Sequence, residues 1–138
     1  IFLQISIGAF VSGMDAGKIY NSWPLMGNSY FPNDNNINNL FEVAAFSDPS
    51  LVQFIHRNLA YFIGIFYILI FYKIYRNKMY DLYKSINYLG IFIILQIILG
   101  IFTVLYGAQI YVASMHQISS IFLVSSSIYF FYLNTKFN

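Results

Sequence analysis

The feature that most constrains this chain is an apolar run from residue 51 to residue 72, with one histidine and one arginine near its start. A helix of about 22 residues extends about 33 Å, which is enough to cross a bilayer. Similar apolar runs cover about residues 1–17, 85–106 and 110–133. We therefore predict an all-α integral membrane protein, in which residues 1–138 form a single four-transmembrane-helix bundle.

Composition supports this class and excludes several others. Of the 138 residues, 59% are hydrophobic and 9% are charged, and the mean hydropathy is +0.63, which is too apolar for a soluble domain. The chain has no cysteine, so disulfides, iron–sulfur clusters and zinc–thiolate sites are excluded. A net charge of +2 is too small to indicate a nucleic-acid-binding protein.

The segments between the apolar runs predict the topology. Residues 18–50 contain all three prolines and many Asn, Asp, Ser and Gly residues, so we expect an outer loop there. The connection over residues 73–84 carries Lys73, Arg76, Lys78 and Lys84, with Asp81 as its only acid. By the positive-inside rule, this inner connection faces the cytoplasm or its organellar equivalent. The long loop, the short turn at residues 107–109 and both histidines then lie near the outer face.

The first apolar run begins without an initiator methionine and without the basic flank of a signal peptide. We therefore expect it to be the end of a transmembrane helix that begins upstream, in a longer protein. Its Leu3-Gln4-Ile5 sequence, followed by Gly8 and Phe10, recurs as Leu95-Gln96-Ile97 followed by Gly100 and Phe102. Each copy precedes a run that contains a histidine. The pattern predicts two helix-loop-helix repeats in parallel orientation, with a binding site at their interface.

The two histidines of the chain, His56 and His116, each lie near the start of an apolar run. Ionisable side chains inside a bilayer are costly, so both are candidate functional residues. Calcium and magnesium prefer oxygen ligands, and zinc would need a third ligand that the sequence does not offer at this depth. Two imidazoles on opposite sides of a haem need no further protein ligand. Haem ligation is the simplest interpretation, and a polar or proton-relay role stays open as the alternative.

Small residues near both histidines would leave space for the edge of a porphyrin ring. They are Ala60 and Gly64 beyond His56, and Ala113, Ser119 and Ser120 around His116. Plain helix packing is the alternative explanation for them. Arg57 could pair with a haem propionate, with Lys18 as a second candidate, or Arg57 could extend its charge to the lipid headgroups. Gln53 and Gln96 are expected to form interhelical hydrogen bonds.

Several motifs follow one another along nearly the whole chain. They are Gly8-Ala9-Phe10-Val11-Ser12-Gly13 with Asp15-Ala16-Gly17, Tyr20-Asn21-Ser22-Trp23-Pro24-Leu25-Met26-Gly27, Val52-Gln53-Phe54-Ile55-His56-Arg57-Asn58-Leu59-Ala60-Tyr61, Leu95-Gln96 with Leu99-Gly100-Ile101 and Thr103, and His116-Gln117. Together they closely resemble the haem A synthase family, and the chain is similar to the C-terminal four-helix half of its members. The most specific part is Tyr-Asn-x-Trp-Pro-Leu-Met combined with Gln-Phe-x-His-Arg.

The resemblance implies a function as well as a fold. Members of the family have eight transmembrane helices in two similar four-helix halves, each with a pair of histidines. They are oxidoreductases that convert a ring methyl group of haem O to the formyl group of haem A, which is needed for cytochrome oxidase assembly. Their later half holds a haem b that passes electrons. By this resemblance the cofactor is haem b, and His56 and His116 are the axial ligands of its iron.

The resemblance also implies what this sequence lacks. The family's catalytic glutamate lies in the earlier half, and neither Asp15 nor Glu42 matches its motif, so no catalytic residue is assigned. The substrate haem O or haem A is expected in that missing half. Membrane lipid, haem O synthase and cytochrome oxidase assembly factors are further expected partners, and nucleic acid is not. The expected location is the bacterial cytoplasmic membrane or the mitochondrial inner membrane. The alternative function is a stand-alone b-type membrane cytochrome or a haem-free structural membrane subunit.

Overall fold

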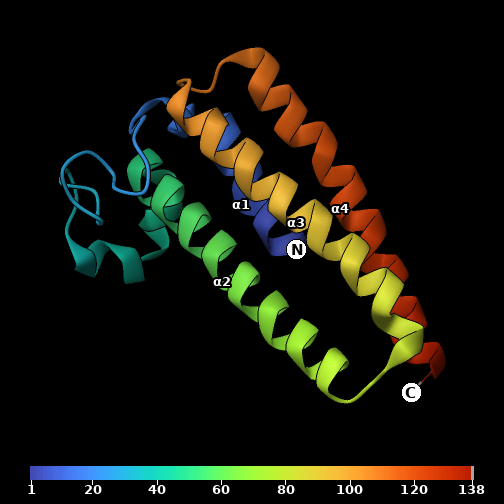
Figure 1. The fold of residues 1–138 in the computed structure, drawn as a ribbon. Helices are drawn as coiled ribbons and strands as arrows, with labels where there is room; N and C mark the ends of the chain where they lie inside the picture. Colours follow the sequence, from blue (N-terminus) through green and yellow to red (C-terminus); the bar gives the residue numbers. More distant parts are fainter. Residues whose placement is uncertain (138) are drawn as a thin grey trace.

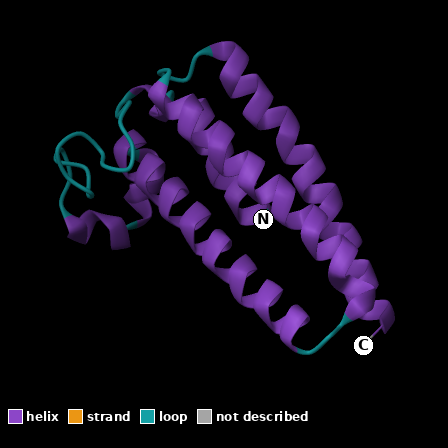
Figure 2. Ribbon diagram, viewed as in Figure 1, coloured by secondary structure: helices purple, strands orange, loops and turns teal. Residues whose placement is uncertain are grey.

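The computed structural model describes residues 1–137, and over this range it consists of helices joined by loops (Figure 1, Figure 2). Its long helices are α1 (Phe2–Gly13), α2 (Pro49–Arg76), α3 (Tyr80–Leu105) and α4 (Ile110–Phe137). Three short 3-10 helices, Ala16–Lys18, Ile37–Phe41 and Val43–Ser47, lie in the segment between α1 and α2. The predicted all-α fold class is confirmed for the described residues.

Three helices are long and apolar enough to cross a membrane: α2, α3 and residues Ile110–Lys136 of α4. Helix α1 is apolar but has 12 residues, so it extends about 18 Å against a hydrocarbon core of about 30 Å. It ends at Gly13, and Asp15, with a φ of 53°, then starts the first 3-10 helix. The chain is therefore a multi-pass membrane protein, whereas the predicted fourth span over residues 1–17 is not confirmed.

Local sequence explains where α2 begins and ends. The Asp48 carboxylate accepts a hydrogen bond of 3.0 Å from the Leu51 amide, which caps the start of the helix. Pro49 occupies the first turn, where a backbone N–H has no helical partner. Lys73 and Arg76 lie in the last turn, where the helix dipole favours positive charge.

The connection between α2 and α3 is shorter than predicted. We expected a polar connection over residues 73–84, but only residues 77–79 lie between the two helices. The segment has no glycine or proline to end a helix early. Its charges also suit helix ends, since Asp81 lies in the first turn of α3, where negative charge is favoured. Most of the charged residues therefore extend the helices instead of forming a loop.

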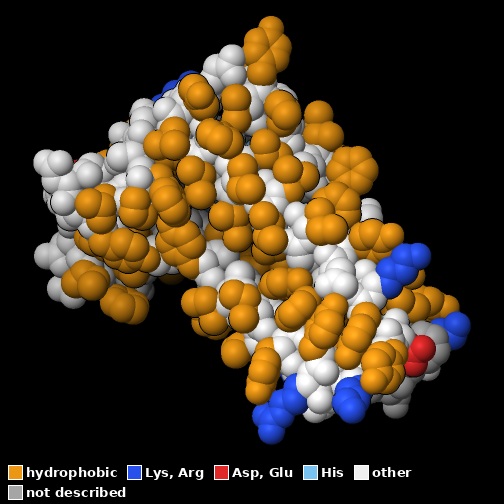
Figure 3. Space-filling view, in the orientation of Figure 1, with side chains coloured by type: hydrophobic (Ala, Val, Ile, Leu, Met, Phe, Trp, Pro, Cys, Tyr) orange, Lys and Arg blue, Asp and Glu red, His pale blue; other side chains and the backbone are white. Residues whose placement is uncertain are grey.

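Figure 1 shows α3 and α4 side by side and antiparallel, and these two helices make extensive contacts, as α1 does with α2. The long α1–α2 segment and the short α3–α4 turn lie at one end of the bundle, and the α2–α3 turn lies at the other. In Figure 3 hydrophobic side chains cover most of the visible face, and most of the visible Lys and Arg side chains gather at the α2–α3 end. This distribution suits a bundle whose solvent is lipid.

Close packing joins α2 to α3 near the α2–α3 turn. The buried side chains of this core are Ile74, Leu82, Ile86, Leu89 and Ile93. Gly90 lies against Tyr67, and a Cβ atom at Gly90 would overlap the Tyr67 hydroxyl oxygen. That hydroxyl donates a hydrogen bond of 3.3 Å to the Ile86 carbonyl. The absence of a side chain at residue 90 therefore permits the close approach of the two helices.

Candidate functional site

His56 lies on α2 and is packed against α1. The side-chain amide of Gln4 donates a hydrogen bond of 3.0 Å to the main-chain carbonyl of His56, and the same nitrogen lies 3.3 Å from the ring Nε2 atom. One turn further along α1, Gly8 faces the ring, since a Cβ atom there would lie 3.1 Å from His56 Cε1. Gln4 and Gly8 thus form the surface on which the His56 imidazole rests.

His116 lies on α4 and has an equivalent environment on α3. The amide of Gln96 donates a hydrogen bond of 3.0 Å to the main-chain carbonyl of His116 and a second one to Ser119 Oγ. Gly100 faces the ring, since a Cβ atom there would lie 3.3 Å from His116 Cε1. The prediction that Gln96 forms interhelical hydrogen bonds is confirmed.

The two histidine environments share the same spacing of glutamine and glycine. Each glutamine precedes its glycine by four residues, which places both on one face of a helix. Sequence reasoning noted the recurring motif but did not assign Gln4 as the partner of His56. The signal that could have indicated this contact is the recurrence of the Leu-Gln-Ile motif, because each copy precedes a segment that contains a histidine.

Both imidazoles are half-buried, and each has a buried ring nitrogen, Nδ1, that no protein group hydrogen-bonds among the described residues. A buried polar atom without a partner is costly, so paired orphan nitrogens indicate a missing ligand or a functional use.

The side chains present limit what such a ligand can be. Within residues 1–137 no group of three or more His, Cys, Asp or Glu side chains could hold a bare metal ion. Two imidazoles can still complete the coordination of an iron that a macrocycle already holds on four sides. Gly8 and Gly100 each allow an imidazole to lie against the neighbouring helix. The residues present therefore fit a haem better than an isolated ion.

Arg57 is buried and faces the loop that follows α1. Its Nη2 atom donates 2.9 Å to the Tyr20 carbonyl, and its Nη1 atom donates 2.9 Å to the Ser22 carbonyl and 3.4 Å to the Leu25 carbonyl. Gln53 adds a hydrogen bond of 3.0 Å to the Tyr20 carbonyl, so its partner is this loop and not another helix. Arg57 and Gln53 together hold the loop against α2. The Nε atom of Arg57 is buried without a hydrogen-bond partner.

Further contacts tie the same loop to the bundle. The indole N–H of Trp23 donates 2.9 Å to the Tyr61 hydroxyl on α2. Asn21 donates 2.9 Å to the Gly17 carbonyl and 3.1 Å to the Val104 carbonyl at the end of α3. The loop therefore bridges α2 and α3 at the end of the bundle nearest the histidines.

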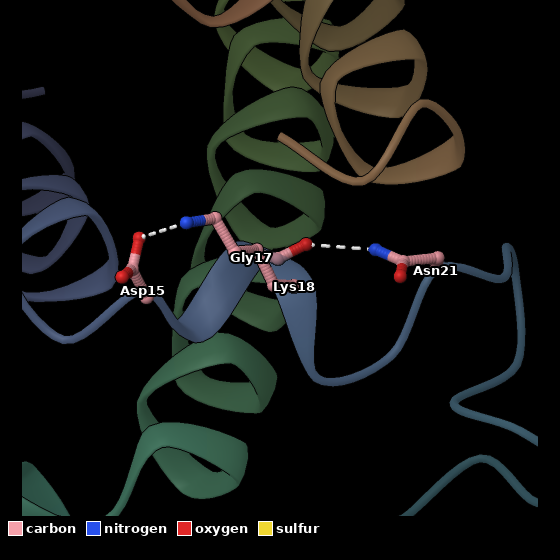
Figure 4. A network of polar contacts seen from close by, with 4 residues as sticks. All are labelled: Asp15, Gly17, Lys18 and Asn21. Carbon is pink, nitrogen blue, oxygen red and sulfur yellow. Dashed lines mark hydrogen bonds and ion pairs between the residues drawn. The ribbon is translucent and has the colours of Figure 1, made fainter. Parts of the chain in front are cut away.

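Lys18 lies at the surface beside this loop. Its ammonium group forms an ion pair of 2.8 Å with Asp15, and both side chains are largely exposed. Figure 4 shows this pair beside the Asn21–Gly17 hydrogen bond. Asp15 is thus engaged with Lys18, and Glu42 is exposed near the distal 3-10 helices.

Asp34 joins the distal part of the loop to the start of α2. Its carboxylate accepts hydrogen bonds from Tyr20 Oη at 2.9 Å and from Ser50 Oγ. Partial burial alone would raise the pKa of Asp34, but the hydrogen bonds from Ser50 and Tyr20 outweigh it and hold the pKa below its usual value. The Tyr20 pKa is raised by desolvation and by the neighbouring Asp34. The ionised carboxylate is therefore part of the folded loop.

The remaining small residues have mixed surroundings. Gly64 faces α3, since a Cβ atom there would lie 3.8 Å from Ile97 Cδ1. Ser119 is buried and bonded to Gln96, and Ser120 donates to the Gln117 carbonyl. Ala60 and Ala113 are half-buried. Their predicted role beside a porphyrin edge stays a prediction.

Comparison with known proteins identifies relatives over nearly the whole chain. A family model described as COX15-CtaA, cytochrome oxidase assembly protein, matches residues 1–128. The "Heme A synthase" of Pelagibacter ubique is 45% identical over 136 residues, which is 99% of this chain and 40% of the relative. Those of Rickettsia felis and Rickettsia bellii are 38% and 42% identical, covering 96% and 91% of this chain and 39% and 37% of the relatives.

The chain thus spans about two fifths of the length of the curated relatives that it matches. No solved structure matches it. The match to the family model nevertheless covers almost all of the sequence, including both histidines and the loop between α1 and α2. The chain belongs to the COX15-CtaA family of cytochrome oxidase assembly proteins.

Proposed function

We propose that this chain is the haem b-binding half of a haem A synthase, the oxidoreductase that converts the methyl group of haem O to the formyl group of haem A. The observation that carries the proposal is the pair of half-buried imidazoles on α2 and α4, each packed against a glycine of the neighbouring helix. The names of the relatives and the family description support the pathway. The four-helix, two-repeat architecture belongs to this proposal, with α1 as part of a longer helix.

His56 and His116 would hold the haem from two helices, α2 and α4. When bound, the haem would supply one-electron transfer. Gln4 and Gln96 hold the main chain at each histidine, which fixes the depth of both side chains in the bundle. The apolar surface of the bundle would exclude water and so favour electron transfer over side reactions.

Arg57 and Lys18 are the proposed partners for the haem propionates. Lys18 lies in the first 3-10 helix of the long α1–α2 segment and Arg57 is bonded to carbonyls of the same segment, and Arg57 retains one unpartnered N–H at Nε. In this proposal the Nη atoms of Arg57 keep the loop in place, while its positive charge attracts the carboxylates. Lys18 would have to leave Asp15, which its exposure permits.

The methyl oxidation itself is proposed to occur outside this chain. Substrate haem O, catalytic residues and contacts to haem O synthase or other assembly factors would belong to the remainder of the protein. The membrane would be the bacterial cytoplasmic membrane or the mitochondrial inner membrane. A stand-alone b-type cytochrome would use the same histidine pair, so haem binding alone does not separate the two functions.

A chimera distinguishes the haem A synthase function from that of a stand-alone b-type cytochrome. These 138 residues replace the corresponding region of the Pelagibacter ubique relative, which is 45% identical over 136 residues, and the chimera is expressed in cells that make haem O but not haem A. We expect chromatography of extracted haems to show haem A with the intact chimera and none with His56→Ala or His116→Ala. Normal haem A production by both histidine variants would contradict the proposal. The parent relative with the equivalent substitutions serves as the matched control.

A further inference from the structure

The Gln4 amide is oriented without ambiguity by its two contacts with His56. Its nitrogen lies 3.0 Å from the His56 main-chain carbonyl and 3.3 Å from the ring Nε2 atom. A carbonyl oxygen can only accept, so the atom beside it must be the amide nitrogen and not the amide oxygen. The same NH₂ group therefore also points a donor at Nε2.

This contact determines which ring nitrogen carries the proton. An amide nitrogen cannot accept a hydrogen bond, so Nε2 must accept and must be unprotonated in the neutral ring. The proton then sits on Nδ1, which is buried and has no hydrogen-bond partner in the described part of the chain. The tautomer of a histidine ligand is set by the hydrogen bonds of its two nitrogens. Here the bond from Gln4 keeps Nε2 unprotonated, with its lone pair engaged by the amide.

The α3–α4 pair provides an internal comparison. Gln96 makes the same main-chain bond of 3.0 Å to His116, but its amide turns its second contact to Ser119 Oγ and not to the imidazole. The second partner of Gln96 is therefore the Ser119 hydroxyl, whereas the second partner of Gln4 is the His56 ring. The two glutamines share the task of holding the histidine main chain, and only Gln4 also acts on the ring.

We propose that Gln4 is a positioning residue for His56, which selects the Nδ1–H tautomer and occupies the unprotonated Nε2 atom until the haem iron displaces it. The inference rests on the proposed function, in which His56 ligates a haem. Gln4 keeps its shorter bond to the main chain and yields the longer ring contact when Nε2 binds iron. Gly8 also contributes to the position of the His56 ring, because a methyl group at residue 8 would lie 3.1 Å from His56 Cε1 and press on the ring.

The first test uses the haem-free chain in detergent, labelled with ¹⁵N-histidine. We expect long-range ¹H–¹⁵N correlation spectra to show the Nδ1–H tautomer for His56. Gln4→Leu should shift His56 toward the Nε2–H tautomer, and Gln4→Glu, which keeps the size of the side chain but offers an acceptor, should do the same. Gln96→Leu is the matched control and should leave the His56 tautomer unchanged. A wild-type His56 with its proton on Nε2 would overturn the proposal without any variant.

The second test is a haem titration of the same proteins, followed by the visible low-spin spectrum. Iron at Nε2 would displace the Gln4 ring contact, so Gln4→Leu removes a competing donor and should bind haem at least as tightly as the wild-type chain. Clearly weaker haem binding by Gln4→Leu, with the chain folded, would contradict the displacement of Gln4 from Nε2 by iron. If the wild-type chain binds no haem while its His56 tautomer still depends on Gln4, the positioning role stands and the haem function fails.

Discussion

Arg57 offers the sharpest prediction, because its sequence-based role and its observed contacts lead to different outcomes. The sequence predicted a propionate partner, whereas the structure shows its guanidinium bonded to the carbonyls of Tyr20, Ser22 and Leu25. The perturbation is Arg57→Lys, which keeps the charge but removes the planar fork of donors.

The magnitude follows from the three distances. Two of the bonds are 2.9 Å long and the third is 3.4 Å. Hydrogen bonds that involve a charged group contribute about 1.5–3 kcal/mol each. A lysine can retain one of the two short bonds, so we expect the loop to lose about 2 kcal/mol of stability, or about 30-fold in its opening equilibrium.

The assay is amide hydrogen exchange of the chain in lipid nanodiscs. The reporting amides are Met26, which donates 2.8 Å to the Ser29 carbonyl, and Gly27, which donates 2.8 Å to Ser22 Oγ. Both should exchange about 30-fold faster in Arg57→Lys, since the loop that orders them opens more often. Arg76→Lys at the opposite end of α2 is the control and should leave both rates unchanged. Unchanged exchange of Met26 and Gly27 in Arg57→Lys would refute the reasoning, whatever the effect of the substitution on haem.

Three further perturbations test other parts of the account. Gly90→Ala should lower the free energy of unfolding by about 1–3 kcal/mol in thermal unfolding, because its methyl group would overlap Tyr67. Adding Tyr67→Ala should relieve this strain. Equal stability of Gly90→Ala and wild type would contradict the packing of these two residues. The lowered pKa of Asp34 means that its contribution to loop stability is present above the unfolded-state pKa and is lost as pH falls through the folded-state pKa. Trp23 fluorescence should therefore report loop loosening only below about pH 4, where carboxylates protonate, and Asp34→Asn should remove that transition; a transition that persists in the variant would exclude Asp34. Reversing the charges of Lys73 and Arg76 should disturb membrane topology, read by cysteine labelling, and leave haem affinity intact; haem loss with normal topology would contradict their placement away from the histidines.

Much of the fold follows from hydrophobic length and charge placement. The runs around His56 and His116 are long enough to indicate spans, and the structure contains both as helices. The ends of α2 and α3 were misjudged because Lys73, Arg76 and Asp81 were treated as loop residues. Charges at helix ends suit the helix dipole and the membrane interface, so polarity alone does not end a helix there.

The histidine pair was predictable from the sequence, but its supporting contacts were only partly so. The interhelical role of Gln96 could be predicted because an amide inside an apolar run needs a partner. The loop contacts of Gln53 and Arg57 could not, since they depend on main-chain carbonyls of residues 20–25, whose positions no periodicity encodes. The contact between Gln4 and His56 likewise joins residues far apart in sequence, and only the recurring Gln–Gly spacing hinted at it.

The measurement that tests the central claim most directly is the low-temperature EPR spectrum of the purified chain, recorded with its reduced-minus-oxidised visible spectrum and the extracted haem. We predict a low-spin, six-coordinate haem b that is lost or becomes high-spin in His56→Ala and in His116→Ala. The Gln117→Ala chain is the matched control and should keep the wild-type spectrum. A well-folded chain that binds no haem, or a low-spin spectrum that survives removal of either histidine, would contradict the claim that these two side chains ligate one iron.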